Sequence, residues 1–162
     1  MTTAHLTERV GVYAELIAEA ALIASGWLGV ARPTTDEYYD LTAIDRLTGE
    51  HKTFQVKTLK RREDRGDNLV LFAKKGDGKP YSLEESADYY LGVLIDDGEV
   101  PRVFAMENRN ISEYWAKETS ASERWVELPV ALDREELAEE SEEGEAEPEN
   151  KPENKFEGER VV

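Results

Sequence analysis

Polar side chains interrupt three otherwise apolar stretches of the sequence. Glu15 and Glu19 lie one helical turn apart in an apolar run. Asp40 lies in a strand-like segment, where aspartate is disfavoured. Gln55 and Lys57 alternate with apolar residues and so share one face of a strand. Each feature alone also fits a purely structural explanation. The glutamates would form a solvent-exposed stripe of the helix, the aspartate would lie at a bend or a sheet edge, and the strand would have one solvent-exposed face.

Together these residues predict a site for phosphate chemistry. A hairpin with strands about 4.8 Å apart would place Asp40 beside Gln55 and Lys57, with Glu15 approaching from the helix. A carboxylate, an amide oxygen and a backbone carbonyl are oxygen ligands of the kind that Mg²⁺ takes while it keeps several waters and accepts phosphate oxygens. A lysine beside such an ion can orient or deprotonate a water, or stabilise charge developing on the phosphate.

The helix that must carry Glu15 is expected over residues 6–25. Thr7 is the expected N-cap, and Ser25-Gly26 is the expected end. Residues 10–24 are almost all apolar, which predicts a largely enclosed helix.

The rest of the chain predicts mainly strands. These are expected at 27–32, 38–44, 51–59, 69–73, 89–95, 102–106 and 125–128, with a loop at 76–80 and a short helix at 111–117. The near-continuous apolar run 89–95 is typical of a central strand that is covered on both faces. We therefore expect an α/β (α+β layered) fold, with a mixed β-sheet flanked by helices.

Charge divides the chain into two expected parts. The net charge is −16, of which −9 belongs to residues 133–162. Such an acidic segment cannot bury enough apolar area to fold, so we expect a disordered tail beyond a short helix at 133–141. A single domain is expected over 1–132. Within it, residues 52–79 carry a local charge of +5.

Composition excludes several function classes. The chain has no cysteine and two isolated histidines, which excludes disulfide frameworks and thiolate zinc sites. His5 and His51 are expected on the surface. No apolar run is long enough to span a membrane, so we expect a cytoplasmic protein with no membrane partner.

Several short motifs carry a family resemblance: Gly11-Val-Tyr-Ala-Glu15, Gly26-Trp27, Arg32-Pro33, Tyr39-Asp40-Leu41 and Phe54-Gln55-Val56-Lys57-Thr58. Together they resemble the PD-(D/E)XK nuclease superfamily, with its restriction-endonuclease-like core. The resemblance covers about residues 8–107, with specific motifs within 11–58. It is strongest to the Gln-x-Lys branch, which includes group I intron homing endonucleases and phage or mobile-element nucleases.

The resemblance implies a Mg²⁺-dependent DNA endonuclease, with Mn²⁺ able to substitute. By analogy with such nucleases, Asp40 would be the main metal ligand, and Gln55 with the Val56 backbone carbonyl would complete the coordination. Lys57 would position or activate the attacking water. Glu15 would hold a metal-bound water or a second metal ion.

Two departures from the family pattern bear on activity. Tyr39 rather than proline precedes Asp40, and Gln55 replaces the usual second acid. The lost negative charge should weaken metal binding. This leaves open a catalytically degenerate, nuclease-fold DNA-binding or regulatory protein. A further alternative is that the acidic tail 133–162 carries the function, as an interaction segment.

The basic segment continues from the Lys57 strand, which suggests DNA phosphates as its ligand. The expected DNA-binding residues are Lys60, Arg61, Arg62, Arg65, Lys74 and Lys75. Small nucleases of this fold commonly cut as dimers or tetramers, so a homo-oligomer is expected by analogy.

Overall fold

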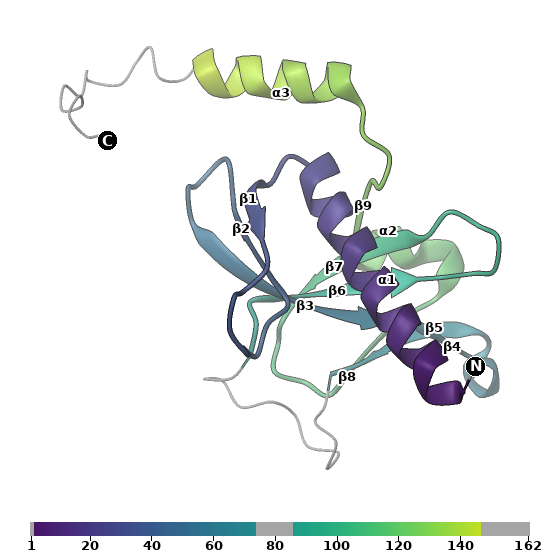
Figure 1. Ribbon diagram of the computed structural model, residues 1–162. Coiled ribbons are helices and arrows are strands. Elements are labelled where there is room, and N and C mark those ends of the chain that lie inside the picture. Colours follow the sequence, from purple (N-terminus) through teal and green to yellow (C-terminus); the bar gives the residue numbers. More distant parts are fainter. Residues whose placement is uncertain (1, 74–85, 147–162) are drawn as a thin grey trace. The chain divides into compact units, whose positions relative to one another are not determined.

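The computed structural model describes residues 2–73 and 86–146, and Figure 1 shows its elements. The chain has a mixed α+β structure with two sheets, which confirms the predicted fold class. It divides after Leu132 into two units, and each is described by itself. The predicted loop at 76–80 lies outside the described residues, as do Lys74 and Lys75.

The first unit contains two α-helices, nine strands and two short 3₁₀ turns among its described residues. In chain order they are α1 (Thr3–Ala24), β1 (Leu28–Ala31), β2 (Leu41–Ile44), β3 (His51–Thr58), β4 (Lys60–Arg62), η1 (Glu63–Arg65), β5 (Asn68–Phe72), β6 (Tyr89–Leu94), β7 (Arg102–Glu107), β8 (Glu113–Ala116), η3 (Glu118–Ser120), α2 (Ala121–Arg124) and β9 (Val126–Leu128).

Helix α1 begins earlier than predicted. Thr2 is its N-cap, and its side-chain oxygen accepts a hydrogen bond from the backbone N–H of His5 at 3.3 Å. The prediction of Thr7 as the cap was wrong, because Thr7 lies within the helix. The helix ends at Ala24, and Gly26 then takes a positive φ of 93°, which suits glycine.

The burial of α1 corrects a second prediction. Small residues such as Ala14 and Ala18 pack with Leu22 against the sheet. On another side of the helix, Leu16 is 52% exposed and Ile23 is 47% exposed. The helix is therefore not enclosed, because in the first unit only one stripe of it faces the core.

The main sheet has six strands in the order β1-β2-β3-β6-β7-β9. Its neighbours are antiparallel except for β3 and β6, which run parallel. Strand β6 lies between β3 and β7, which confirms the central strand predicted at 89–95.

Side-chain alternation on β6 shows that the main sheet is covered on both faces. Leu91 and Val93 belong to the core that α1 covers. Tyr90 and Leu94 belong to a second core, together with residues of a three-stranded sheet of order β4-β5-β8. In Figure 1, α1 crosses the main sheet, and β4, β5 and β8 lie near one end of the helix. The first unit therefore has three layers, with the main sheet in the middle.

The helix predicted at 111–117 was wrong. Strand β8 occupies this segment and pairs antiparallel with β5. Tyr114 and Ala116 are buried while Trp115 between them is 41% exposed. This period of two is that of a strand, and it outweighed the local helical pattern once β5 offered an edge for pairing.

Gly92 makes the close approach of the two sheets possible, and we predict that Gly92→Ala destabilises the fold. An added Cβ would lie 2.9 Å from Leu59 Cγ and Cδ2 and 3.2 Å from Leu71 Cδ1, and both leucines are buried. Overpacking of this kind should lower the free energy of unfolding by about 1–3 kcal/mol. Denaturant unfolding measures the change.

Gly11→Ala is the matched control for this substitution. Gly11 is inside α1, and a Cβ there meets nothing within 4 Å. Its replacement should raise the free energy of unfolding by about 0.5–1 kcal/mol, since alanine is the better helix former. Equal effects of the two substitutions would contradict the packing at Gly92.

The second unit begins with an acidic helix, α3 (Arg134–Ala146). The Asp133 side chain accepts hydrogen bonds from the backbone N–H groups of Glu135 and Glu136, each at 3.1 Å. A short helix was predicted at 133–141, and α3 extends beyond it. Residues 147–162 lie outside the described residues. In the part of the chain that the structure describes, no helix combines the length and apolar character needed to cross a membrane.

Candidate metal and phosphate site

Asp40 is held by two hydrogen bonds to β3. Its backbone N–H donates to the Phe54 carbonyl at 2.8 Å, and its side-chain Oδ2 accepts from the Val56 N–H at 2.8 Å. The residue lies just before β2, rather than inside a strand as predicted. The carboxylate thus satisfies an N–H of β3 beyond the end of β2, which fixes the side chain beside that strand.

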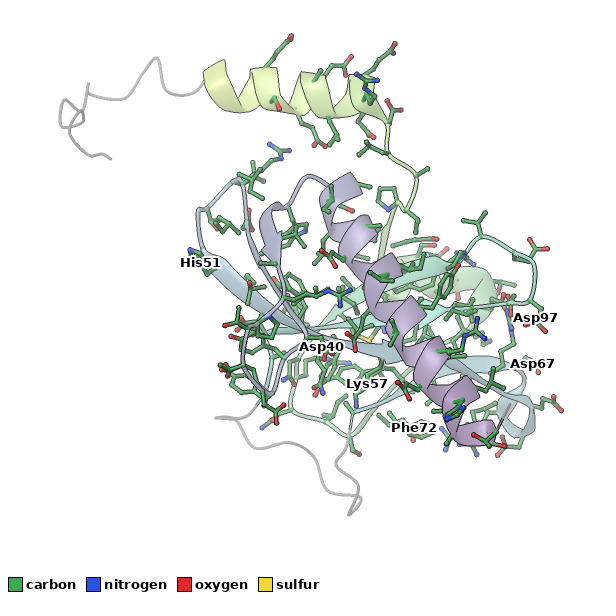
Figure 2. All side chains as sticks on the ribbon, viewed as in Figure 1. Asp40, His51, Lys57, Asp67, Phe72 and Asp97 are labelled. Atoms are coloured by element: carbon green, nitrogen blue, oxygen red, sulfur yellow. The ribbon has the colours of Figure 1, made fainter. Side chains whose placement is uncertain are left out.

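Gln55 and Lys57 lie next to Asp40 on β3. Leu41 pairs with Phe54, and the two hydrogen bonds of Asp40 to Phe54 and Val56 place it beside the stretch of β3 that contains Gln55. Phe54 and Val56 pack in the core under α1, so Gln55 and Lys57 lie on the other face of the sheet. Figure 2 labels Asp40 and Lys57, with His51 at the opposite end of β3 from Lys57.

The side chain of Gln55 has an oxygen suited to bind a cation. Gln55 makes contacts within the fold, and its Oε1 atom is buried. An amide oxygen is also among the ligands that hard divalent cations take.

Glu15 lies on α1, so it approaches Asp40 from the sheet face opposite to Gln55 and Lys57, and it is half-buried. Burial raises the pKa of its carboxyl above the ordinary value, the negative charge of Asp40 raises it further, and the Arg32 guanidinium lowers it. These effects show that Glu15 and Asp40 lie within electrostatic range of each other. A positive charge between them would favour the ionised form of Glu15.

Arg32 and Glu19 also belong to this region, although the sequence assigned neither a role. Arg32 follows β1, and its Nε donates to Glu19 Oε1 at 3.0 Å. Glu19 lies one helical turn beyond Glu15. The available sequence signals were this helical spacing and the Arg32-Pro33 motif, but neither could show that β1 lies beside this part of α1.

The donor set is poor in carboxylates. Among the described residues, no group of three or more His, Asp or Glu side chains is placed to hold a metal ion. Besides Glu19, which pairs with Arg32, the acids of this region are Glu15 and Asp40, and Gln55 contributes an amide where the family pattern has an acid. Neutral oxygens would therefore have to complete a coordination shell.

The arginines of the basic segment are already paired with acids. Arg61 donates to both Asp96 and Glu118, with nitrogen–oxygen distances of 2.8–2.9 Å for three of the four hydrogen bonds. Arg62 pairs with Asp64, and Arg65 pairs with Glu113. Lys60 is exposed and has no ion pair with any described residue. The predicted phosphate-binding arginines thus have carboxylate partners within the fold.

The Arg61 pairs connect three elements, and we predict that Arg61→Gln lowers stability in a pH-dependent way. Hydrogen bonds from Arg61 hold the pKa values of Asp96 and Glu118 below their ordinary values. Lowered carboxyl pKa values stabilise the fold at neutral pH, and this stabilisation is lost as the pH falls through the acid range. Because the pairs are partly exposed, the substitution should remove about 1 kcal/mol at pH 7.

Urea unfolding at pH 7 and at stepwise lower pH measures this effect. The difference between the wild type and Arg61→Gln should shrink as both acids become protonated. Arg62→Gln is the control, since Arg62 pairs with Asp64 two residues away and connects no distant elements. A difference that stays constant with pH would show that the Arg61 pairs do not stabilise the fold.

Comparisons with known proteins support the fold. No family model matches the chain, and no curated protein matches it. A solved structure of a bacterial homing endonuclease, I-Ssp6803I, aligns with a TM-score of 0.54 and 22% identity over 69% of this chain and 78% of that chain. The chain has a nuclease-like fold. The solved structure of MepB aligns with a TM-score of 0.32 and 16% identity, over 70% of this chain and 79% of that chain.

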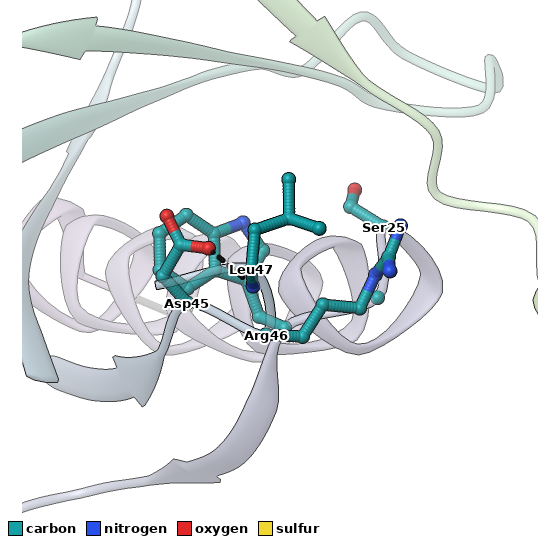
Figure 3. A pocket seen from close by; sticks show the side chains of 6 residues that line it. Ser25, Asp45, Arg46 and Leu47 are labelled. Atoms are coloured by element: carbon teal, nitrogen blue, oxygen red, sulfur yellow. Dashed lines mark hydrogen bonds between the residues drawn. The ribbon is translucent and has the colours of Figure 1, made fainter. Parts of the chain in front are cut away.

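A pocket lies elsewhere in this nuclease-like fold. It has a volume of about 210 Å³ and is lined by Ser25, Gly26 and Trp27 after α1 and by Asp45, Arg46 and Leu47 after β2. Figure 3 shows it, with Asp45 Oδ1 accepting a hydrogen bond from the Leu47 N–H at 2.8 Å. None of the candidate site residues lines this pocket. His5 and His51 are exposed, as predicted.

Proposed function

We propose that this protein is a Mg²⁺-dependent DNA endonuclease of the PD-(D/E)XK type that hydrolyses phosphodiester bonds. The hydrogen bond from the Val56 N–H to Asp40 is the observation that carries the proposal. It holds a carboxylate beside the Gln55 and Lys57 pair, which is the arrangement that the sequence motifs imply. The nuclease-like fold of the chain supports the same conclusion.

The residues present fit a hard divalent cation. Asp40 and the Gln55 Oε1 would bind it directly. The N–H and C=O of one strand residue point toward the same neighbouring strand, so the Val56 carbonyl is directed to the side where Asp40 lies. Glu15 would bind through a water or hold a second ion. Such an ion would supply a Lewis acid for a phosphate oxygen and would lower the pKa of a bound water.

Lys57 would act on the attacking water and on the charge of the phosphate. It shares the sheet face of Gln55, two residues along β3. Its ammonium group can orient a water by hydrogen bonding and can attract the negative charge that grows on the phosphate oxygens. Asp40 and Glu15 would limit where the cation and that water can lie.

Cleavage assays test this proposal. Duplex, branched and single-stranded DNAs are incubated with the full chain and Mg²⁺ or Mn²⁺, and nicking is followed on denaturing gels. Cleavage of at least one substrate that stops on addition of EDTA is expected. The absence of cleavage from every substrate with both metals would overturn the proposed activity.

A second candidate function rests on the small number of carboxylates at the candidate metal site. With Gln55 in place of a second strand acid, the protein would be a DNA-binding or regulatory module that keeps the fold without catalysis. Calorimetric titration with Mn²⁺ separates the two. The endonuclease should bind the ion, whereas the non-catalytic module should bind DNA in a salt-sensitive way and bind no metal.

The proposed partner is DNA, and the proposed assembly is a homo-oligomer. One site per chain cuts one strand at a time, so cutting both strands at one place is simplest with two copies related by symmetry. Light scattering with and without a DNA duplex measures the assembly.

A further inference from the structure

The phosphate-binding residues predicted on the basic segment do not provide a phosphate contact at the candidate metal site itself. Arg61, Arg62 and Arg65 each have carboxylate partners, which offset their positive charges. A phosphate would compete with these carboxylates, so little affinity is gained. A positively charged side chain nearer to Asp40 would be better placed to bind a phosphodiester.

Arg32 has the position and geometry of such a cation. Ala31 pairs with Thr42, so the register of β1 with β2 carries Arg32 to the end of the sheet where Asp40 lies. Its Nε donates to Glu19, and its terminal nitrogens make no hydrogen bond with any described residue. An arginine anchored through Nε can still offer two N–H donors in a plane, a geometry that matches a phosphate.

We propose that Arg32, anchored by Glu19, binds a DNA phosphate beside the candidate metal site. The inference rests on the proposed function and adds the substrate contact that this function lacks. The Arg32 side chain is 41% exposed, so DNA can reach it, while Glu19 is 28% exposed and restricts its motion. Glu19 lies one helical turn from Glu15, so its ion pair with Arg32 places the guanidinium near that candidate ligand.

The charges of this region make phosphate binding depend on a divalent cation. Glu15, Glu19 and Asp40 carry three negative charges when ionised, against the one positive charge of Arg32. This group is therefore net negative by two charges and repels a phosphodiester. A divalent cation neutralises it. Arg32 can then contribute to DNA binding without opposition from the carboxylates.

DNA binding by fluorescence anisotropy tests the proposal. Ca²⁺ replaces Mg²⁺ because it takes the same oxygen ligands, and a parallel titration contains EDTA. Arg32→Ala should weaken Ca²⁺-dependent binding of a labelled duplex by about tenfold or more. It should also reduce the slope of log affinity against log salt by about 0.9, the value for one phosphate contact. In EDTA the two proteins should bind equally weakly.

Arg102→Ala is the matched control. Arg102 also donates through Nε to a glutamate, Glu127, at 2.9 Å, and its side chain is 37% exposed. Its loss should leave the salt slope unchanged. Arg32→Lys provides a second test if Arg32→Ala unfolds. A lysine keeps the charge but not the planar donor pair, so binding should weaken while the salt slope stays near the wild-type value.

The outcomes separate the inference from the proposed function. A merely structural Arg32 would change the melting temperature of the variants and leave the salt slope and Ca²⁺ dependence as in the wild type. That result overturns the inference alone. A wild-type protein that binds no DNA in either Ca²⁺ or EDTA, and cleaves none in Mg²⁺, would overturn the proposed function as well.

Discussion

Asp40→Asn is expected to lower the rate of metal-dependent DNA cleavage by about a thousandfold or more, the scale of several kcal/mol of metal-ion stabilisation. The substitution removes the negative charge that would bind the ion. It keeps a side-chain oxygen that can accept the hydrogen bond of the Val56 N–H. The local fold should therefore survive while activity is lost. Single-turnover cleavage with saturating enzyme measures the rate, and circular dichroism checks the fold.

Asp88→Asn is the control for this effect. Asp88 also accepts a backbone N–H of β3, that of Thr53, at 2.8 Å. Both aspartates thus make the same kind of contact to one strand, but Asp88 lies toward its other end. Cleavage by Asp88→Asn should stay within about twofold of the wild type, since surface changes away from special features usually alter energies by less than 0.5 kcal/mol. Equal losses in both variants would show that Asp40 acts through the fold alone.

Lys57→Ala is expected to reduce cleavage by about a hundredfold to a thousandfold, the range seen when one charge-stabilising donor is removed. Metal binding should persist, because the proposed oxygen ligands remain in place. Lys57→Ala should therefore lower cleavage and leave metal binding unchanged. Single-turnover rates with Mg²⁺ report the chemical step, and Mn²⁺ titration calorimetry reports the binding.

Lys52→Ala is the control for charge on the same strand. Lys52 lies near the start of β3 and pairs with Glu50 at 2.9 Å. Its loss removes one positive charge from β3 without touching the site. If Lys52→Ala lowered cleavage as much as Lys57→Ala, a general effect of charge on DNA binding would replace the specific role of Lys57.

The layered fold was predictable because its central features are local patterns. The run 89–95 is apolar on both faces, and it became strand β6 between β3 and β7. The hairpin of β2 and β3 followed from alternation and from turn residues between two strand-like segments. Strand β8 was missed because its pairing with β5 joins segments about 45 residues apart, and no local pattern contains that information.

The candidate site was predictable to the extent that it lies on one hairpin. The pairing of β2 with β3, which brings Asp40 beside Val56, joins strands that are adjacent in the sequence. The contact of Arg32 with Glu19 joins β1 to the middle of α1, so it depended on how the helix crosses the sheet. The partners of Arg61 lie 35 and 57 residues away in sequence. Their presence changes the interpretation of the basic segment, which carries positive residues but already pairs its arginines with acids.

A crystal structure of the wild-type protein soaked in Mn²⁺ tests the central claim most directly. Anomalous scattering identifies the ion, and the coordination distances identify its ligands. We predict one ion bound to Asp40 and to Gln55 Oε1 at about 2.0–2.2 Å, close to the distances typical of Mg²⁺ and oxygen. A fully soaked crystal in which neither residue contacts a metal ion would contradict the assignment of a divalent-cation site at this hairpin.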